Sequence, residues 1–440
     1  MKRKRYAILL LLAVISLLAG CSMRTIKEMY SPPKRPEGYT NLQTQINQVM
    51  VGAEYCAPIS GENRQAVQSA DLDGDEIPEY LLFTKTSKDN PLQIHIFTGD
   101  GKEYYLLGTI SSPGNSFELI EYQQLDGRDG VEIIVGKKVS NQIPRNVSVY
   151  TLQDGQIRQL MTTNYSKFVC TDLDRDSKSE ILVLRPGETN ADNGIAELYS
   201  VIDGVMERSA QVDMSEPSES IKRIMVGKLQ DGQNAVYVAS DVDGNAIVTD
   251  IYTLMENSLT NVTFSNESGT GVNTLRNYYV YADDIDVDGV LELPDLTPMK
   301  LPDETPDGQW KYLIRWYSMY SDGTEHEKVY TYHNFTAGWY MQLRTSLANR
   351  IFVVERGNGY LFGVWDETYS TNSHIATIYA LTGQNREQEA TVGNRFVLHR
   401  TESTVFAADL DVSAAVYNIS KEEIINSFHL ILQDWNTGET

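Results

Sequence analysis

The chain has 440 residues, of which 41% are hydrophobic, so it is too apolar to be disordered and long enough for two or three domains. Its 60 acidic residues outnumber 37 basic ones, which gives a formal net charge of −23. A nucleic-acid binder needs a basic face, so this balance argues against nucleic acid as a partner. Three cysteines are too few for a disulfide-stapled scaffold.

The first residues have the layout of a secretion signal over residues 1–20. Four basic residues at positions 2–5 precede an apolar run from Tyr6 to Leu18, which is shorter than a membrane span. The run ends in Leu18-Ala19-Gly20-Cys21, which resembles the lipobox of bacterial lipoproteins. The resemblance implies that Cys21 is lipidated on its sulfur and holds the chain on the extracytoplasmic face of the cell membrane. An uncleaved anchor and a non-lipidated signal peptide are the alternatives.

Residues 21–40 are predicted to form a tether between the lipid and the folded body. Pro32, Pro33 and Pro36 favour extended backbone in this stretch. Loss of the four positive charges of the signal peptide takes the formal charge of the chain from −23 to −27. The basic residues of the tether suit an anionic membrane surface, while its prolines hold the acidic body away from that surface.

A repeated acidic motif gives the strongest indication of the fold. Three segments read Asp-x-Asp-x-Asp-x-x-x-Glu, and two degenerate copies begin at Gln124 and Leu229. The acidic residues of the complete motifs are Asp71, Asp73, Asp75 and Glu79; Asp172, Asp174, Asp176 and Glu180; and Asp284, Asp286, Asp288 and Glu292. The first positions of the five copies are 53, 48, 57 and 55 residues apart. Between them, short alternating strands meet at Asp-Gly turns, and about four strands per repeat is typical of a β-propeller blade.

These loops resemble those of FG-GAP/VCBS-type repeats in integrin-α-like propellers, although the Phe-Gly and Gly-Ala-Pro elements of that family are not evident. The resemblance covers residues 60–300 and implies calcium bound between blade strands. The expected fold is therefore mainly β. Propeller-like repeats are predicted over residues 41–335, with five visible and six or seven blades in the ring, and a helix containing Leu42 and Ile46 is expected to begin this body.

The spacing of the motif suits calcium, which prefers about six to eight oxygen ligands in a flexible cage. A tight loop directs the side chains at positions 1, 3 and 5 to one point, and the carboxylate at position 9 closes the cage. A backbone carbonyl is expected from position 7, which is Ile77, Lys178 or Val290. The alternative for any single loop is a solvated acidic turn.

Related loops are expected to lack the metal. In the Gln124 copy, Arg128 stands at the third ligand position, so an ion pair with Asp126 and Glu132 is predicted to replace the ion. The Leu229 copy lacks two ligands. Residues 241–245 also carry two aspartates, but no acid follows at the ninth position, and a hairpin turn is the favoured interpretation.

A small α+β domain is predicted for residues 336–440, where the repeat is lost. It resembles C-terminal domains of uncharacterised bacterial surface lipoproteins. A capping box at Ser420–Glu423 and an apolar stripe from Ile424 to Trp435 predict a terminal helix that ends at Gly438. Six strands are expected at Trp339–Leu343, Ile351–Glu355, Tyr360–Trp365, Ile375–Ala380, Arg395–His399 and Val405–Asp409.

Two features leave alternatives open. The aromatic-rich segment Trp310–Tyr340 is interpreted as cross-strand packing, with a sugar-stacking platform as the alternative. Cys56 and Cys170 could form a disulfide outside the cytosol or remain as two buried thiols.

The function expected from these features is a lipid-anchored, calcium-stabilised binding protein with an unidentified protein or glycan ligand. The alternative is a cell-envelope enzyme that acts on polysaccharide. No G-x-S-x-G, H-E-x-x-H or G-x-x-x-x-G-K motif occurs, and the six histidines show no metal-ligand spacing, so the binding function is favoured.

Overall fold

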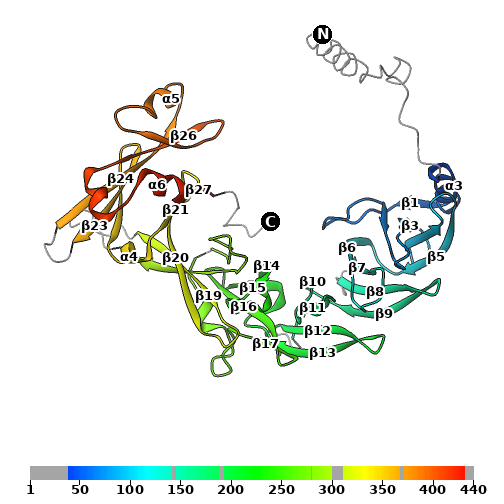
Figure 1. Ribbon diagram of the computed structural model, residues 1–440. Helices are drawn as coiled ribbons and strands as arrows, with labels where there is room; N and C mark the ends of the chain where they lie inside the picture. Colours follow the sequence, from blue (N-terminus) through cyan, green and yellow to red (C-terminus); the bar gives the residue numbers. More distant parts are fainter. Residues whose placement is uncertain are drawn as a thin grey trace, which may run out of the picture. The chain divides into compact units, whose positions relative to one another are not determined.

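The computed structural model of the chain describes residues 38–140, 145–187, 193–278, 280–299, 311–366 and 371–431 (Figure 1). The expected signal peptide, Cys21 and the tether as far as residue 37 lie outside the described residues. Among the helices that are described, none has both the length and the apolar character needed to span a bilayer.

The chain divides into two compact units, both built mainly of β-strands. One comprises Met1–Ile120 with Leu152–Ile157, and the other comprises Glu121–Thr151 with Arg158–Thr440. Within the described residues the strands form six sheets of four or five strands, and the pairs whose register is defined are antiparallel. This confirms the mainly β fold that the short alternating runs predicted.

The first sheet follows helix α3 (Tyr39–Val49), which begins the folded body as expected. Leu42 and Ile46 of this helix pack against Leu82, Phe97 and Tyr104 of the sheet. The strands β2 (Val67–Ala70), β3 (Glu79–Thr86), β4 (Leu92–Gly99) and β5 (Tyr104–Ser112) pair in chain order, and β1 (Ala53–Tyr55) also pairs with β3.

Three further sheets repeat this order of four consecutive strands. One contains β6 (Ser116–Gln123), β7 (Glu132–Lys138), β8 (Arg145–Gln153) and β9 (Gln156–Asn164). The next contains β10 (Lys167–Thr171), β11 (Glu180–Arg185), β12 (Ile195–Ile202) and β13 (Val205–Asp213). The third contains β14 (Ile221–Lys228), β15 (Asn234–Val242), β16 (Ala246–Met255) and β17 (Ser258–Asn261), with η1 (Ser218–Ser220) before it and η2 (Val272–Thr274) after it.

The acidic loops occupy the same place in successive sheets, between the first and second strands. In the loop led by Asp71 the flanking pair is Ala70 and Glu79, and in the loop led by Asp172 it is Thr171 and Glu180. In the loop led by Asp284 the first strand is reduced to an isolated bridge between Asp283 and Glu292. The ninth-position glutamate therefore begins the second strand in the first two of these loops, and Glu292 directly precedes the strand that starts at Leu293.

The fifth sheet contains the aromatic segment. Its strands are β18 (Leu293–Pro298), β19 (Tyr312–Met319), β20 (Glu325–Asn334), β21 (Trp339–Leu343) and β27 (Phe428–Leu430). Trp316 and Trp339 are fully buried, and the indole N–H of Trp316 donates to the hydroxyl of Thr331 at 2.7 Å. Burial of these rings agrees with the cross-strand packing interpretation and leaves them no face for a sugar.

The last sheet has the order β22-β23-β24-β26-β25. Its strands are β22 (Ile351–Arg356), β23 (Gly359–Asp366), β24 (Thr371–Thr382), β25 (Phe396–Arg400) and β26 (Thr404–Leu410). All six strands expected after residue 336 therefore exist. The first of them, β21, pairs with β20, so the boundary predicted after residue 335 falls inside the fifth sheet.

The short helices of this region are α4 (Thr345–Ala348), α5 (Arg386–Glu389), η3 (Val412–Tyr417) and α6 (Lys421–Ser427). The expected cap of α6 is present, because the hydroxyl of Ser420 accepts from the backbone N–H of Glu423 at 3.2 Å. The predicted length is wrong: the helix ends at Ser427, and Phe428–Leu430 form β27 beside β21. Pairing with an available sheet edge outweighs the helical pattern of the apolar residues. Gly438 lies outside the described residues.

Cys56 and Cys170 are both half-buried free thiols. The sequence left open a disulfide or two buried thiols, and the structure shows two separate thiols that are partly rather than fully buried.

Candidate metal sites

Each complete acidic loop gathers three carboxylates that could hold a metal ion. The groups are Asp71, Asp73 and Glu79; Asp172, Asp174 and Glu180; and Asp284, Asp286 and Glu292. Within each group, one ligand oxygen from each residue lies within 4.8 Å of the others. Positions 1, 3 and 9 of the motif thus converge as the sequence predicted.

The fifth-position aspartates lie outside these groups. Their Oδ1 atoms accept instead from the backbone N–H of position 7. The acceptor–donor distances are 2.8 Å for Asp75 and Ile77, 2.8 Å for Asp176 and Lys178, and 2.9 Å for Asp288 and Val290. The second carboxylate oxygen of Asp176 forms an ion pair with Lys178, and that of Asp288 forms one with Lys328. The sequence expected the fifth position to be a ligand as well, but the structure does not bring it into the convergent groups.

The first aspartate of each loop organises the backbone around it. Oδ1 and Oδ2 of Asp71 accept from the N–H groups of Gly74 and Glu76 at 2.7 and 3.0 Å. Asp172 receives the equivalent bonds from Arg175 and Ser177 at 2.6 and 3.0 Å. In the third loop the donors to Asp284 are Asp288 and Gly289, both at 2.9 Å. One carboxylate therefore fixes each loop even before a ligand arrives.

An unusual backbone conformation accompanies these bonds. Positions 4 and 6 have positive φ in all three complete loops: 79° and 67° at Gly74 and Glu76, 66° and 71° at Arg175 and Ser177, and 61° and 85° at Val287 and Gly289. A β-branched residue such as Val287 is disfavoured there, so the loop stores strain. Three chemically different pairs of residues adopt the same path, which indicates that the motif's carboxylates impose the loop conformation.

The ninth-position glutamates are buried, and each accepts an equivalent hydrogen bond from the backbone of its own loop. An Oε2 atom accepts from the backbone N–H of position 2, at 2.9 Å between Glu79 and Leu72 and at 2.8 Å between Glu180 and Leu173. In the third loop Glu292 accepts from Ile285 at 3.1 Å. This bond ties the start of the second strand to the beginning of the loop, so the carboxylate cannot turn outward to water.

Burial and neighbouring acids make these carboxylates hard to ionise in the absence of a cation. Burial, followed by repulsion from nearby aspartates, raises the pKa of Glu180 to about 7 and that of Glu292 to about 8. The pKa of Glu79 is also raised, mainly by burial. A divalent cation would remove both causes, because it replaces lost hydration and neutralises the aspartates.

The third-position aspartates behave in the same way. Burial raises the pKa of Asp73, Asp174 and Asp286, and repulsion from the fifth-position aspartate adds to the increase in each. For Asp286, the nearby Lys328 ammonium partly offsets this increase. The donor set, made of hard carboxylate oxygens held close together, fits a hard cation better than a soft metal.

In the Gln124 loop, polar side chains form hydrogen bonds and an ion pair within the loop itself. The amide oxygen of Gln124 accepts from the N–H groups of Asp126 and Gly127 at 3.0 and 2.7 Å, while its amide nitrogen donates to the carbonyls of Arg128 and Gly130. Arg128 forms an ion pair with Asp126, with Nε to Oδ2 at 2.7 Å. Burial opposes the ionisation of Asp126, but its bonds to Arg128 prevail and its pKa is lowered. The predicted pairing of Arg128 with Asp126 is thus confirmed.

Two other acidic segments form a structural hydrogen-bonded contact and a hairpin turn. In the Leu229 loop, Oδ2 of Asp231 accepts from the hydroxyl and backbone N–H of Ser321 at 2.6 and 3.1 Å, and Leu229 is fully buried. Residues 243–245 turn the chain between β15 and β16, with Val242 paired to Ala246. The hairpin interpretation of the 241–245 segment is confirmed.

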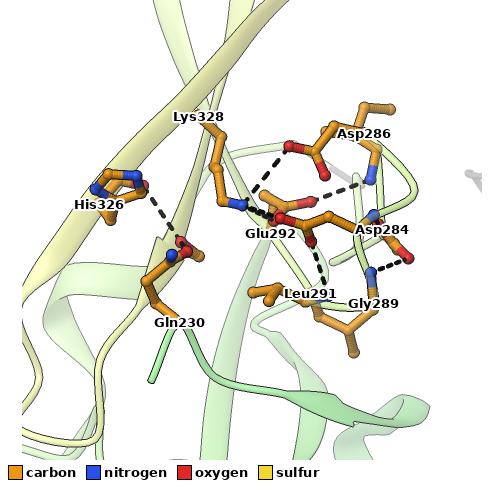
Figure 2. A network of polar contacts seen from close by, with 12 residues as sticks. Gln230, Asp284, Asp286, Gly289, Leu291, Glu292, His326 and Lys328 are labelled. Carbon is orange, nitrogen blue, oxygen red and sulfur yellow. Dashed lines mark hydrogen bonds and ion pairs between the residues drawn. The ribbon is translucent and has the colours of Figure 1, made fainter. Parts of the chain in front are cut away.

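A basic residue that sequence reasoning missed lies at the third loop. Lys328, on β20, directs its ammonium group at Asp286, Asp288 and Glu292 (Figure 2). In the sequence, strands and a turn separate Lys328 from the loop. The spacing of these residues therefore does not predict the contact. Only the pairing of β19 with both β18 and β20 brings it there.

The chain matches no model of a known protein family, and it matches no curated protein.

Proposed function

We propose that the chain is a lipid-anchored, calcium-stabilised binding protein on the extracytoplasmic face of a bacterial cell membrane. The observation that carries the calcium part is the repetition of one arrangement in three loops. Each has convergent oxygens from positions 1, 3 and 9, a buried glutamate with raised pKa and the same left-handed backbone positions. An acidic turn with no ligand has no reason to keep all three features.

The proposal extends to the arrangement of the sheets, which would form the blades of an FG-GAP/VCBS-type propeller. Four-stranded antiparallel order and a loop between the first and second strands support it. Such a ring offers one face of loops as a rigid binding surface for a protein or glycan. Small-angle X-ray scattering that fits an open row of sheets would overturn this part of the proposal.

Calorimetric titration of the full chain in detergent with calcium chloride tests the metal sites directly. Extracellular calcium modules bind at about 10⁻⁴–10⁻³ M, so saturable heat in that range is the expected result. Mature protein without measurable binding at calcium concentrations well above that range would contradict the proposal.

The anchor rests on the sequence Leu18-Ala19-Gly20-Cys21. We expect Cys21→Ser to abolish incorporation of labelled fatty acid and to block normal processing of the signal peptide, because the variant lacks the sulfur to which the lipid would be attached. Metabolic labelling followed by membrane fractionation measures both effects. Continued labelling of the variant and its recovery with membranes would show that Cys21 is not the lipid attachment site.

A further inference from the structure

The third acidic loop differs from the other two in having a half-buried lysine beside its carboxylates. The Nζ atom of Lys328 lies 3.6 Å from Oδ2 of Asp286 and 3.8 Å from Oε1 of Glu292, and it forms an ion pair with Asp288. The lysine side chain is only 10% exposed. Figure 2 shows it entering the loop from the neighbouring β-hairpin, on the side where the acidic side chains converge.

The corresponding surroundings of the other loops are different. In the second loop Lys178 pairs with Asp176, but both side chains are more than one-third exposed, so water can replace this pair at little cost. Within the described residues no lysine or arginine forms an ion pair with the acids of the first loop. Lys328 lies within 4 Å of two of the three carboxylates that converge at its site, Asp286 and Glu292, and also pairs with the fifth-position acid.

The hydrogen bonding of Glu292 is a second observation that indicates a cation site in the third loop. Glu292 is fully buried, and its Oε1 atom has no hydrogen-bond partner in the described part of the chain. The equivalent oxygen of Glu79 accepts from the hydroxyl of Thr98 at 2.9 Å. At 3.8 Å, Lys328 is too far away to donate a hydrogen bond to Glu292, so it supplies charge to this oxygen without satisfying it.

We propose that Lys328 is a resident cation of the third loop, and that calcium binds there only when the ammonium group moves away. This inference rests on the proposed calcium function of the loops. One loop cannot accommodate both cations beside Asp286 and Glu292, because their like charges would repel within the same small cage. The third site is therefore the weakest of the three, and its occupation is coupled to the position of the β19–β20 hairpin.

The test is calorimetric titration of the full chain in detergent with calcium, comparing the wild type with Lys328→Met. Methionine keeps an unbranched apolar stem and removes the charge. We expect two similar sites and a third, weaker one in the wild type, and a third site tightened by about tenfold or more in the variant. Lys328→Gln should have the same effect, whereas Lys328→Arg should keep the third site weak.

A matched control removes one positive charge elsewhere. Lys222 is exposed on β14, so Lys222→Met should leave all three calcium affinities unchanged. Circular dichroism of each variant in chelator establishes that it is folded. If Lys328→Met and Lys328→Gln fold and bind calcium with the wild-type number and affinities, the role of Lys328 is refuted while the calcium sites stand. If neither wild type nor variants bind calcium, the proposed calcium function itself fails.

Discussion

Removal of calcium is expected to lower the melting temperature of the protein by several degrees. At a calcium concentration about tenfold above the dissociation constant, each occupied site stabilises the folded state by RT ln 11, or about 1.4 kcal/mol. The loops led by Asp71 and Asp172 together contribute about 3 kcal/mol, which is a large share of a typical stability of ~5–15 kcal/mol. Thermal melts in excess calcium and in chelator measure the difference.

Magnesium should restore only part of this stability, because it demands octahedral geometry and gives up its water reluctantly. Simultaneous replacement of Asp73, Asp174 and Asp286 by alanine should remove most of the calcium response, since each variant position supplies one of the convergent oxygens.

The Gln124 loop provides the matched control. Asp126→Ala breaks the ion pair with Arg128 and lowers the melting temperature in every buffer, but the difference between calcium and chelator should be the same as in the wild type. Identical melting of the wild type in excess calcium and in chelator would mean that the three loops are acidic turns and nothing more.

The repeat and its strands could be predicted because both signals are local. An apolar run such as Ile181–Leu184 starts directly after the loop glutamate and predicts a strand. The Asp-Gly pair within 243–245 predicts the hairpin turn. The same reasoning predicted that positions 1, 3, 5 and 9 converge, and the structure brings together positions 1, 3 and 9 but not position 5. Local chemistry also gave the ion pair of Arg128 and Asp126.

The features that the sequence did not predict depend on tertiary pairing or on a backbone conformation that residue type does not indicate. The apolar stripe after Ile424 fits a helix, yet Phe428–Leu430 join β21 because a sheet edge is available there. Lys328 could not be assigned to the third loop, because its place is set by the pairing of β20 with β19. The left-handed backbone conformation at Val287 could not be predicted either, since no propensity scale favours valine in that conformation.

Calcium affinity is expected to fall as the pH is lowered from about 8 to about 5. The metal-free folded protein holds the pKa of Glu180 at about 7 and that of Glu292 at about 8, against 4.5 for an unperturbed glutamate. At pH values between the unfolded pKa of 4.5 and these raised pKa values, the folded state binds more protons than the unfolded state. The stability of the metal-free protein therefore decreases as the pH rises through this range. Calcium needs the ionised carboxylates, so its binding must release these protons.

The release can be measured by calorimetric titration in two buffers with different ionisation enthalpies. At about pH 7, the second loop should release about half a proton per calcium, because Glu180 is then half protonated. Glu180→Gln should remove this release and weaken the second site, since glutamine offers a neutral oxygen in place of a carboxylate. Glu132 is a matched control: burial also raises its pKa, but it belongs to the Gln124 loop. Glu132→Gln should therefore leave calcium-linked proton release unchanged. Calcium affinities that are equal at about pH 5 and about pH 8 would show that the buried glutamates do not ligate the ion.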